Sequence, residues 1–384
     1  MSDATVLILG GGVGGVVAAV EARKRLPREH RIVVVDREQR HVFAPSLLWL
    51  ITGERRAQQI SRPLERLGRK GIDVVHGEVS AIDPAARRVS VSGRDIEADH
   101  LVVALGADWA PETVPGLAEA GETYVTLEGA ERLRDAFARF ESGRLVVITA
   151  SPAYKCPAAP YEAAMLLEAK LRRRGVRERV EIELYSAEPG PMGVTGPDVS
   201  AAVGRMVESK GIRYHPGHQV SKVDPEGRRL HFANDATADF DLLVYMPPIR
   251  VPKVLHEAGL AGEGGWVPVD RHTMETAFER VYAIGDVTGI PLKLGKPLPK
   301  AGVFAHAQGS VVANNVALAV TGGGRRATFD GRGECFVEIG DGRAAMGGGN
   351  FYAEPVPAIK LRRPGRLWHW GKILFERDWL RRWF

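Results

Sequence analysis

The sequence predicts an α/β protein that consists of two Rossmann-like domains and a C-terminal region. Two short apolar runs, at Thr5–Leu9 and at residues 143–150, each precede a turn and a helical segment, as at the start of a parallel βαβ unit. Glycine is the third observation: 44 of 384 residues is about 11%, against an ordinary ~7%. Excess glycine without a collagen-like period indicates many tight turns and close backbone approaches.

Composition and charge describe a globular protein with a large core. Apolar residues make up 45% and charged residues 26%, which excludes a disordered or fibrous chain. The 52 basic and 47 acidic side chains leave a net charge of +5, too small to favour a nucleic-acid partner. No apolar run reaches about 18 residues, and the chain opens directly on a strand pattern. We therefore expect neither a transmembrane helix nor a signal peptide.

The first strand leads into a turn with the dinucleotide-binding spacing G-x-G-x-x-G, formed by Gly10, Gly12 and Gly15. The first glycine permits the tight turn, the second lets the backbone approach a pyrophosphate, and the third lets helix and strand pack closely. The helix that we expect at residues 16–24 would point its N-terminus at the anion. This strand–turn–helix context distinguishes the motif from a merely glycine-rich turn.

An acidic residue and two distant segments complete the predicted nucleotide site. Asp36 ends the second predicted strand, where a carboxylate suits a ribose hydroxyl. The segment that ends in Gly285 and Asp286 resembles the part of two-dinucleotide flavoproteins whose aspartate binds the ribityl chain of FAD, although Asp286 alone could be a helix cap. Residues 99–107, with Gly106, resemble the segment at which those proteins cross to their second domain. The sequence therefore predicts FAD in the first domain.

The second Rossmann-like domain lacks a phosphate-binding loop. After its first strand, residues 151–161 contain three prolines and no glycine. Proline offers no N–H to a phosphate, and the other side chains crowd the backbone, so we do not expect NADH as the electron donor. A helix at 162–174 and a strand at 180–185 still complete a βαβ unit. The expected boundaries are residues 1–110 and 266–320 for the FAD-binding domain, 111–265 for the second domain and 321–384 for the C-terminal region.

The chain contains two cysteines, too few for a secreted disulfide scaffold. Cys156 lies in the glycine-free loop, and Cys335 lies much later, in a strand predicted at 333–340. Cysteines so distant in sequence are commonly inert core residues. The proline-rich setting of Cys156, where another enzyme would hold nicotinamide, favours a redox role instead.

Six segments together resemble the sulfide:quinone oxidoreductases and the flavoprotein subunit of flavocytochrome c sulfide dehydrogenase, over nearly the whole chain. The specific signals are the cysteine loop at 156–162 and the Leu-Pro-Lys-Ala-Gly segment at 298–302. The opening glycine motif is generic. The six segments are residues 71–79, 156–162, 241–248, 298–304, 335–341 and 372–376.

The resemblance implies that Cys156 and Cys335 flank the flavin and form a redox disulfide or a polysulfur bridge. Sulfide would attack one sulfur, and the released thiolate would pass two electrons to the flavin. Glu162 matches an acidic residue of the family that relays protons, although a carboxylate in a first helical turn can also serve only the helix. Lys300 would stabilise the charge of reduced flavin at its N1–O2 edge.

The resemblance also implies the remaining contacts of both ligands. Phe336 and Tyr352 resemble aromatic residues around a quinone ring, although aromatic side chains commonly belong to a core. The Gly302 amide could assist Lys300 beside the flavin. The predicted FAD contacts are Gly10, Gly12, Gly15, Asp36, Val79, Gly106, Gly285, Asp286, Lys300 and Gly302.

The chain departs from both families at three places. Residues 118–133 lack the third cysteine of many sulfide:quinone oxidoreductases, and residues 190–196 lack the family's usual histidine. Pro45 stands near the position at which flavocytochrome c flavoproteins attach FAD through a cysteine, so we expect non-covalent FAD. The cysteine loop is closer to the flavocytochrome type. The native sulfur species is therefore open, and a c-type cytochrome is an alternative acceptor to quinone.

Two further hypotheses share the fold. An NADH:quinone oxidoreductase would need the missing glycine loop, and a non-catalytic sensor could use the cysteines as a redox switch. His215 and His218 offer two metal ligands without an evident third, so no metal is expected.

The C-terminal tail combines basic and aromatic side chains. Residues 360–384 hold eight lysines or arginines, against Glu376 and Asp378, and four of the seven tryptophans. A helical stripe of aromatic side chains suits a membrane interface and predicts a peripheral membrane protein that delivers electrons to quinone. A tail packed on the protein or on a second subunit is the alternative, so a homo-oligomer is left open. The stripe consists of Trp368, Phe375, Trp379 and Trp383.

Overall fold

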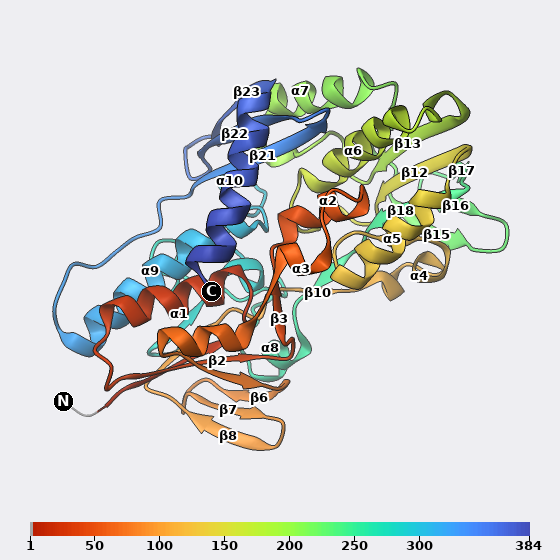
Figure 1. The fold of residues 1–384 in the computed structure, drawn as a ribbon. Helices are drawn as coiled ribbons and strands as arrows, with labels where there is room; N and C mark the ends of the chain where they lie inside the picture. The colour runs from red at the N-terminus through yellow and green to blue at the C-terminus, as the bar shows by residue number, and fades with distance from the viewer. Residues whose placement is uncertain (1–2) are drawn as a thin grey trace.

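The computed structural model describes residues 3–384 and is organised around two five-stranded parallel sheets (Figure 1). The first sheet has the strand order β20–β9–β1–β2–β5, and the second has the order β11–β18–β12–β13–β14. Parallel sheets need cover on both faces, which is why their strands read as continuous apolar runs. The predicted α/β class with Rossmann-like sheets is confirmed.

The first sheet consists of β1 (Thr5–Leu9), β2 (Arg31–Asp36), β5 (Asp73–His76), β9 (His100–Val103) and β20 (Val281–Ala283). Strand β1 pairs with β2 on one side and with β9 on the other. The strand order therefore reverses at the carboxyl end of β1. In open α/β sheets, ligands bind at such a switch point.

Two helices, α1 (Val13–Arg25) and α9 (Gly302–Thr321), pack against one another on one face of this sheet (Figure 1). The opposite face packs on β6 (Val79–Asp83) and β7 (Arg88–Val91), with β8 (Arg94–Glu97) completing a small antiparallel sheet. Helix α9 is long and apolar enough to cross a membrane, a segment that we did not expect from the sequence. Its most apolar stretch is 56% buried, because α9 is a core helix here.

The second sheet consists of β11 (Glu122–Thr123), β12 (Gly143–Thr149), β13 (Val180–Ser186), β14 (Arg213–His215) and β18 (Leu242–Met246). Alternate residues of its strands face two different apolar cores. One core is shared with helices, and the other with a small antiparallel sheet. The helices are α2 (Leu47–Ile51), α5 (Leu127–Arg139), α6 (Ala159–Arg173) and α7 (Pro197–Glu208), and the small sheet contains β15 (Val220–Asp224), β16 (Arg229–Phe232) and β17 (Thr237–Asp239).

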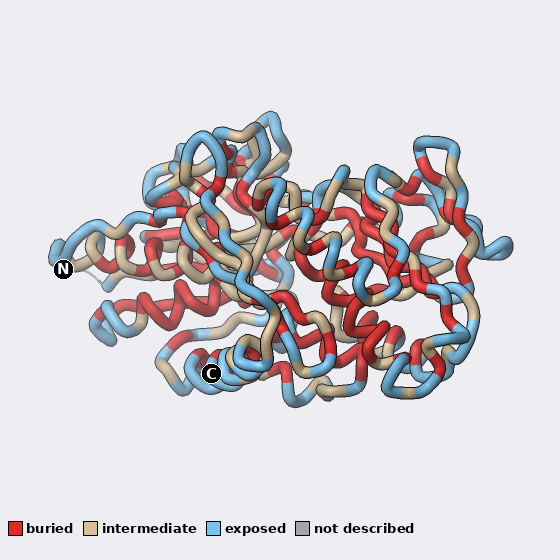
Figure 2. The backbone as a smooth tube through the Cα atoms, turned by 90° about the horizontal axis from the view of Figure 1, so that it is seen from above, coloured by how far each residue is buried: buried red, intermediate tan, exposed pale blue. Residues whose placement is uncertain are grey.

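The chain crosses between the two halves through β10 (Asp108–Trp109) and β19 (Ile249–Arg250), which pair antiparallel. Buried segments lie inside both halves, while the outer loops are exposed (Figure 2). The remaining short elements are β3 (Arg40–Val42), β4 (Ser61–Pro63), α3 (Ala57–Ile60), α4 (Leu117–Ala120) and α8 (Lys253–Glu257).

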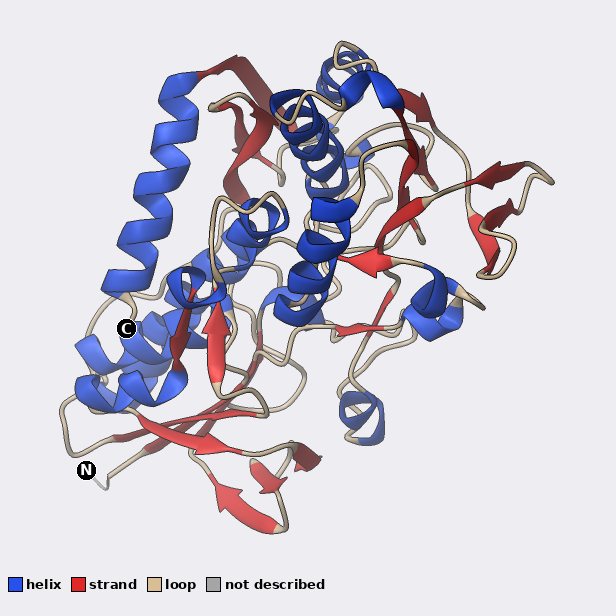
Figure 3. Ribbon diagram, turned by 45° about the vertical axis from the view of Figure 1, so that its right-hand side comes forward, coloured by secondary structure: helices blue, strands red, loops and turns tan. Residues whose placement is uncertain are grey.

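The C-terminal region is an antiparallel sheet of β21 (Arg332–Gly340), β22 (Arg343–Asn350) and β23 (Ala358–Gly365), followed by the helix α10 (Arg366–Arg382). Helix α10 contacts β21, β22 and β23, then runs back along the edge of the molecule toward α1 (Figures 1 and 3). It therefore joins the C-terminal sheet to the first domain.

The prediction that the aromatic stripe of this helix faces a membrane is wrong. Trp379 and Trp383 are each only 2% exposed and belong to the same core as α1 and α9. The apolar residues that do face solvent are Leu367, Trp370 and Leu374, with Phe375 at the margin. The helix carries aromatic residues on more than one side, so the sequence pattern alone did not identify its buried face.

Candidate active site

The glycine motif forms a turn that fits a dinucleotide. Gly10 has a φ of +104°, and a Cβ there would collide with the carbonyl oxygen of Ala104. A Cβ on Gly15 would collide with the carbonyl oxygen of Gly10, so only glycine permits this close packing. A Cβ on Gly12 would meet nothing within 4 Å, because this position borders open space at the start of α1. That space lies where the motif places a pyrophosphate.

Two residues hold this turn in place: Asp36, at the end of β2, and His41, in β3. One Asp36 carboxylate oxygen accepts a hydrogen bond from the Gly11 amide, and the other accepts one from the Glu38 amide at 2.7 Å. Nδ1 of the buried His41 lies 2.9 Å from the carbonyl oxygen of Gly11. The predicted position of Asp36, at the carboxyl end of β2 beside the glycine turn, is therefore where the structure places it.

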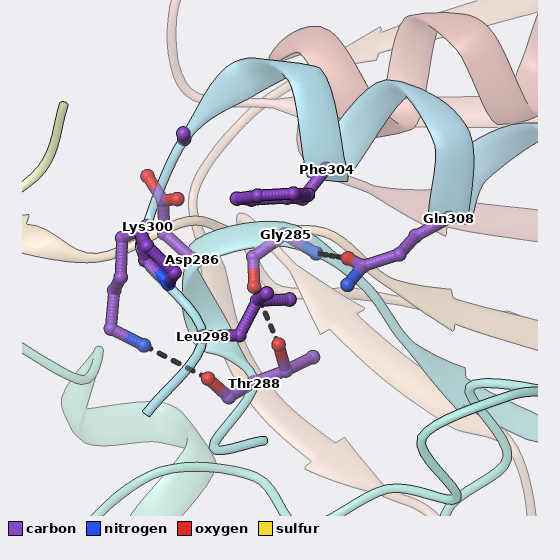
Figure 4. A pocket seen from close by; sticks show the side chains of 9 residues that line it. Gly285, Asp286, Thr288, Leu298, Lys300, Phe304 and Gln308 are labelled. Carbon is purple, nitrogen blue, oxygen red and sulfur yellow. Dashed lines mark hydrogen bonds between the residues drawn. The ribbon is translucent and has the colours of Figure 1, made fainter. Parts of the chain in front are cut away.

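A cavity with about 210 Å³ of empty volume lies beside the start of α9 (Figure 4). The predicted residues Gly285, Asp286 and Lys300 all line it. The Gly285 amide donates to the side-chain oxygen of Gln308 at 2.7 Å, and the Lys300 ammonium donates to the carbonyl oxygen of Thr288 at 2.8 Å. Burial lowers the pKa of Lys300 to about 8, although the Asp286 carboxylate acts in the opposite direction.

Lys155 is a charged residue of this region that sequence reasoning missed. Its ammonium lies 3.7 Å from the Asp286 carboxylate and 4.4 Å from the ring centre of Trp109. A Cβ built on Gly106 would lie 3.9 Å from the same ammonium. The only signal in the sequence was a basic residue directly before Cys156, in a loop that the fold directs toward the FAD-binding half.

Like the other predicted FAD contacts, Gly302 and Val79 remain predictions. Gly302 is the first residue of α9, next to Ala301, which lines the cavity. Val79 is buried in the core between the first sheet and its small antiparallel neighbour. Its backbone, rather than its side chain, is the part that could face a ligand.

The two cysteines line one apolar pocket with about 620 Å³ of empty volume. Cys156 lies between β12 and α6, and Cys335 lies on β21, so the fold joins residues that are far apart in the sequence. Both are free thiols. Pro299, Ala301 and Phe304 line this pocket and the smaller cavity beside α9 alike, so the two spaces are neighbours.

The backbone of the cysteine loop is strained and fixed. Cys156 has a φ of +55°, a conformation that costs free energy for a residue with a side chain. Its amide donates to the carbonyl oxygen of Lys300 at 2.8 Å, and its carbonyl oxygen accepts from the Ala159 amide at 2.9 Å. These bonds attach the loop to the segment that lines the cavity beside α9, which we call the flavin-side cavity because its lining includes predicted FAD contacts.

The electrostatic environment keeps both thiols protonated at neutral pH. Burial raises the pKa of Cys335 to about 11 and raises the pKa of Cys156 further. The nearby Glu162 carboxylate raises the pKa of both thiols, whereas the Lys372 ammonium lowers it. A thiolate therefore forms at this site only when a thiol gives up its proton or when a disulfide bond to that sulfur breaks.

Glu162 lies in the first turn of α6 and is nearly fully buried. One of its oxygens accepts a hydrogen bond from the Glu338 amide at 2.8 Å and lies 3.3 Å from the ammonium of Lys372. Burial raises the pKa of Glu162, and Lys372 opposes that shift. Sequence reasoning did not identify Lys372 as the partner. Its place inside an otherwise apolar helical stripe was the available signal.

The nucleotide site of the second domain is closed by a side chain of its own loop. The Tyr154 hydroxyl donates to the Glu188 carboxylate at 2.6 Å, and Tyr154 is only 7% exposed. Glu188 follows the second strand of this βαβ unit, the position from which an acidic residue binds a ribose in dinucleotide-binding domains. Because Tyr154 bonds the Glu188 carboxylate, that carboxylate is not free to bind the ribose of such a nucleotide.

Phe336 and Tyr352 lie in different surroundings. The Phe336 ring centre is 6.5 Å from that of Phe375 on α10. The Tyr352 hydroxyl donates to the carbonyl oxygen of Arg271 at 2.7 Å, and the Arg271 guanidinium lies 3.8 Å from its ring centre. Their assignment to a quinone site remains a prediction. Within residues 3–384 no group of three or more metal-ligating side chains gathers, His215 and His218 included.

Comparisons with known proteins identify the family of this chain. The family model for pyridine nucleotide-disulphide oxidoreductases matches residues 4–309. The sulfide-quinone reductase of Aquifex aeolicus is 28% identical over 403 residues, which covers 98% of this chain and 90% of the relative. The mitochondrial sulfide:quinone oxidoreductase of Mus musculus is 24% identical over 368 residues, 91% of this chain and 79% of the relative.

A solved structure gives the same result for the fold. The X-ray structure of the sulfide:quinone oxidoreductase from Aquifex aeolicus has a TM-score of 0.88 at 25% identity, and the match covers 99% of this chain and 91% of that one. The chain belongs to the pyridine nucleotide-disulphide oxidoreductase family and is an FAD-dependent oxidoreductase with the fold of the sulfide:quinone oxidoreductases.

Proposed function

We propose that the protein oxidises sulfide, or a related sulfur species, at Cys156 and Cys335 and passes the electrons through FAD to a quinone. One observation carries the proposal: the two cysteines line a single apolar pocket that shares three wall residues with the flavin-side cavity. The Aquifex and mouse relatives, which are named for reactions of sulfide and quinone, support it.

In the oxidised pair, hydrosulfide forms a bond to one cysteine sulfur while the bond between the cysteine sulfurs breaks, which leaves a persulfide and a thiolate. The thiolate then bonds to the outer sulfur of the persulfide, which gives a trisulfide bridge and releases two electrons and one proton. FAD would be held by the glycine turn, Asp36 and Asp286 and would supply the two-electron acceptor, and quinone would take up the two electrons with two protons. A second hydrosulfide that takes the middle sulfur of the bridge and leaves as hydrodisulfide would restore the disulfide.

The residues of this chain prepare that chemistry in two ways. The strained Cys156 is fixed by the Lys300 carbonyl, so its sulfur is presented at a set position beside the flavin cavity. The Lys300 residue lines the same cavity, and its ammonium, with a pKa that burial lowers to about 8, would stabilise negative charge on a reduced flavin.

The closed second nucleotide site disfavours NADH as electron donor. A nicotinamide dinucleotide would need a glycine turn at 151–161 and a free acidic group at Glu188. The loop instead contributes three prolines, and Tyr154 bonds Glu188. The retained βαβ unit therefore serves to carry Cys156 rather than a second dinucleotide.

Attachment to a membrane surface is part of the proposal, now through a different face of α10. Leu367, Trp370 and Leu374 are 73%, 59% and 62% exposed at helical spacing, with Arg377 and Arg381 continuing the same side. Exposed apolar side chains next to arginines suit a lipid interface. The face lies on the helix that also contacts Phe336, which would shorten the path from a membrane quinone to the site.

The deciding experiment is an anaerobic titration of the purified holoprotein, followed by the flavin absorbance near 450 nm. We expect about stoichiometric sulfide to bleach the flavin and NADH to leave it oxidised. If NADH bleaches the flavin and sulfide does not, the proposal is overturned. Re-oxidation of the sulfide-reduced protein by a soluble quinone, compared with a c-type cytochrome, then identifies the acceptor.

Vesicle flotation tests the surface of α10. We expect Leu374→Glu to reduce binding to vesicles that contain anionic lipid, because the charge replaces an apolar contact with the interface. Ala85→Glu, an exposed position with the same change of charge, is the matched control and should bind as the wild type does. Equal binding by Leu374→Glu and the wild type would overturn the assignment of this face.

A further inference from the structure

Lys155 belongs to the second domain, in the loop between β12 and α6, yet its side chain reaches the FAD-binding half. Its ammonium lies 3.7 Å from the Asp286 carboxylate, and the two side chains are 21% and 20% exposed. The ammonium also lies 4.4 Å from the ring centre of Trp109, on the crossing strand β10. A Cβ added at Gly106 would lie 3.9 Å from it. Lys155 therefore adjoins two residues that are predicted to contact FAD, Gly106 and Asp286.

The cations of this region outnumber the carboxylates that face them. The Asp286 carboxylate faces the ammoniums of both Lys155 and Lys300, and the two ammoniums repel one another (Figure 4). Asp108 also faces Lys155, but it is paired with the Arg37 guanidinium at 3.1 Å. With both lysines protonated, the group keeps one positive charge in surplus. Such a surplus suits a site that receives a cofactor with a negatively charged pyrophosphate.

The loop is attached to both halves of the molecule by neighbouring residues. Tyr154 bonds the Glu188 carboxylate, within the second domain. The next residue, Lys155, is directed to the FAD-binding half instead. Cys156 follows with a φ of +55°, a conformation that persists only where the surroundings hold it. Two attachments to different halves thus stand directly before the strained residue, and Lys155 is the one that belongs to the FAD site.

We propose that Lys155 is a positioning residue that couples the binding of FAD to the conformation of the loop that carries Cys156. Asp286, ordered by its contact with FAD, holds the Lys155 ammonium, and the ammonium holds the backbone from which Cys156 turns. Coupling of this kind is reciprocal, so the loop in turn favours retention of FAD. The inference requires the cofactor but no particular sulfur substrate, and it goes beyond the proposed function.

Lys155→Met tests the cofactor end of the coupling, because methionine keeps an unbranched side chain without the charge. Release of FAD from the diluted holoprotein is followed by the recovery of flavin fluorescence. We expect release at least about tenfold faster than in the wild type, as the loss of a contact between charged groups predicts. Lys155→Arg keeps the charge and should stay close to the wild-type rate.

Lys253→Met is the matched control for the loss of a paired lysine. The Lys253 ammonium pairs with the Glu257 carboxylate at 2.7 Å, but its side chain is 87% exposed on α8. The change removes the same charge and the same kind of partner far from solvent-shielded surroundings. FAD release should therefore match that of the wild type.

Alkylation by iodoacetamide reports on the cysteine end of the coupling. It is measured in holoprotein that carries Cys335→Ser, in which Cys156 is the only thiol. We expect Lys155→Met to raise the alkylation rate at least about tenfold, because a loop freed from the FAD-binding half opens more often. Lys155→Arg and Lys253→Met should leave the rate near that of the Cys335→Ser parent.

The two measurements must change together. Faster alkylation with unchanged FAD release would assign Lys155 to the loop alone, and faster release with unchanged alkylation would make it a cofactor contact alone; either result overturns the coupling. Wild-type behaviour of Lys155→Met in both measurements does the same. If circular dichroism shows that Lys155→Met does not fold, Lys155→Gln takes its place with the same expected changes. No measurement contains sulfide, so failure of the proposed function leaves this test intact.

Discussion

The indole Nε1–H of Trp379 donates a 3.1 Å hydrogen bond to Nε2 of His41. This bond fixes the imidazole tautomer, because an Nε2 that accepts leaves the ring proton on Nδ1. Nδ1 then donates to the carbonyl oxygen of Gly11, inside the glycine turn. Burial lowers the pKa of His41, which agrees with a neutral ring. The C-terminal helix therefore supports the FAD-binding turn through one histidine.

We expect Trp379→Phe to weaken that support while it keeps an aromatic ring in the core. The loss of one donor to a buried acceptor should lower the free energy of unfolding by about 1–3 kcal/mol and speed the release of FAD. Urea unfolding and the rate of flavin fluorescence recovery measure the two effects. Trp370→Phe, exposed on the same helix, should stay within about 0.5 kcal/mol of the wild type. Equal losses in both variants would contradict the His41 link.

FAD should be bound without a covalent link, since Pro45 stands where a linking cysteine would be. Acid precipitation should release yellow FAD into the supernatant, and colour retained in the pellet would contradict this. Asp286→Ala should lose FAD, because the aspartate lines the flavin-side cavity, and the rest of the protein should stay folded by circular dichroism. Normal FAD occupancy in that variant would refute the role of Asp286.

Cys156 and Cys335 should act as one unit. Cys156→Ser and Cys335→Ser should each abolish reduction of the flavin by sulfide while FAD stays bound, because either change removes the exchange step. The double variant should be scarcely worse than either single one. If the cysteines served only for packing, their substitution would cost about 1–3 kcal/mol of stability and leave the rate intact. A near wild-type rate in one single variant would exclude the two-cysteine mechanism.

The reactivity of Cys335 should rise with pH far beyond the ordinary range of a thiol. Burial and Glu162 raise its pKa to about 11, so the reactive thiolate is the disfavoured form below that pH. In Cys156→Ser protein, alkylation of Cys335 should increase about tenfold for each pH unit up to about 11. In denaturant the same curve should level off near pH 8.5, the ordinary value for a thiol. A plateau near pH 9 in the folded protein would show that the pocket does not disfavour the thiolate.

The parts of the site that are local in sequence were predictable. The glycine turn is one such part, because β1, the three glycines and α1 are contiguous and their spacing has a steric meaning. Residues 162–174 were predicted as a helix, but α6 begins at Ala159, since Pro160 is tolerated in a first turn. The sequence also indicated the loss of the second phosphate loop, though not that Tyr154 bonds Glu188.

The pairings between distant segments were not predictable from one sequence. Lys372 meets Glu162 across more than half the chain, and Lys155 meets Asp286 across the domain crossing. Neither pair has a spacing rule, because the fold alone brings the residues together. The face of α10 was misassigned for the same reason: Trp379 is buried by partners such as His41 that periodicity does not reveal.

Pro299, Ala301 and Phe304 form a common wall between the flavin-side cavity and the cysteine pocket. Under the proposed function, the choice of substrate and the binding of the cofactor therefore depend on the same residues. Under the same proposal, a change at Phe304 that enlarges the cysteine pocket would also alter the surroundings of the flavin, so selection for a new substrate would act on both at once. Variants that accept a bulkier sulfur compound without a change in flavin spectrum should arise at residues that line only the cysteine pocket, such as Met192, Val199 or Leu361.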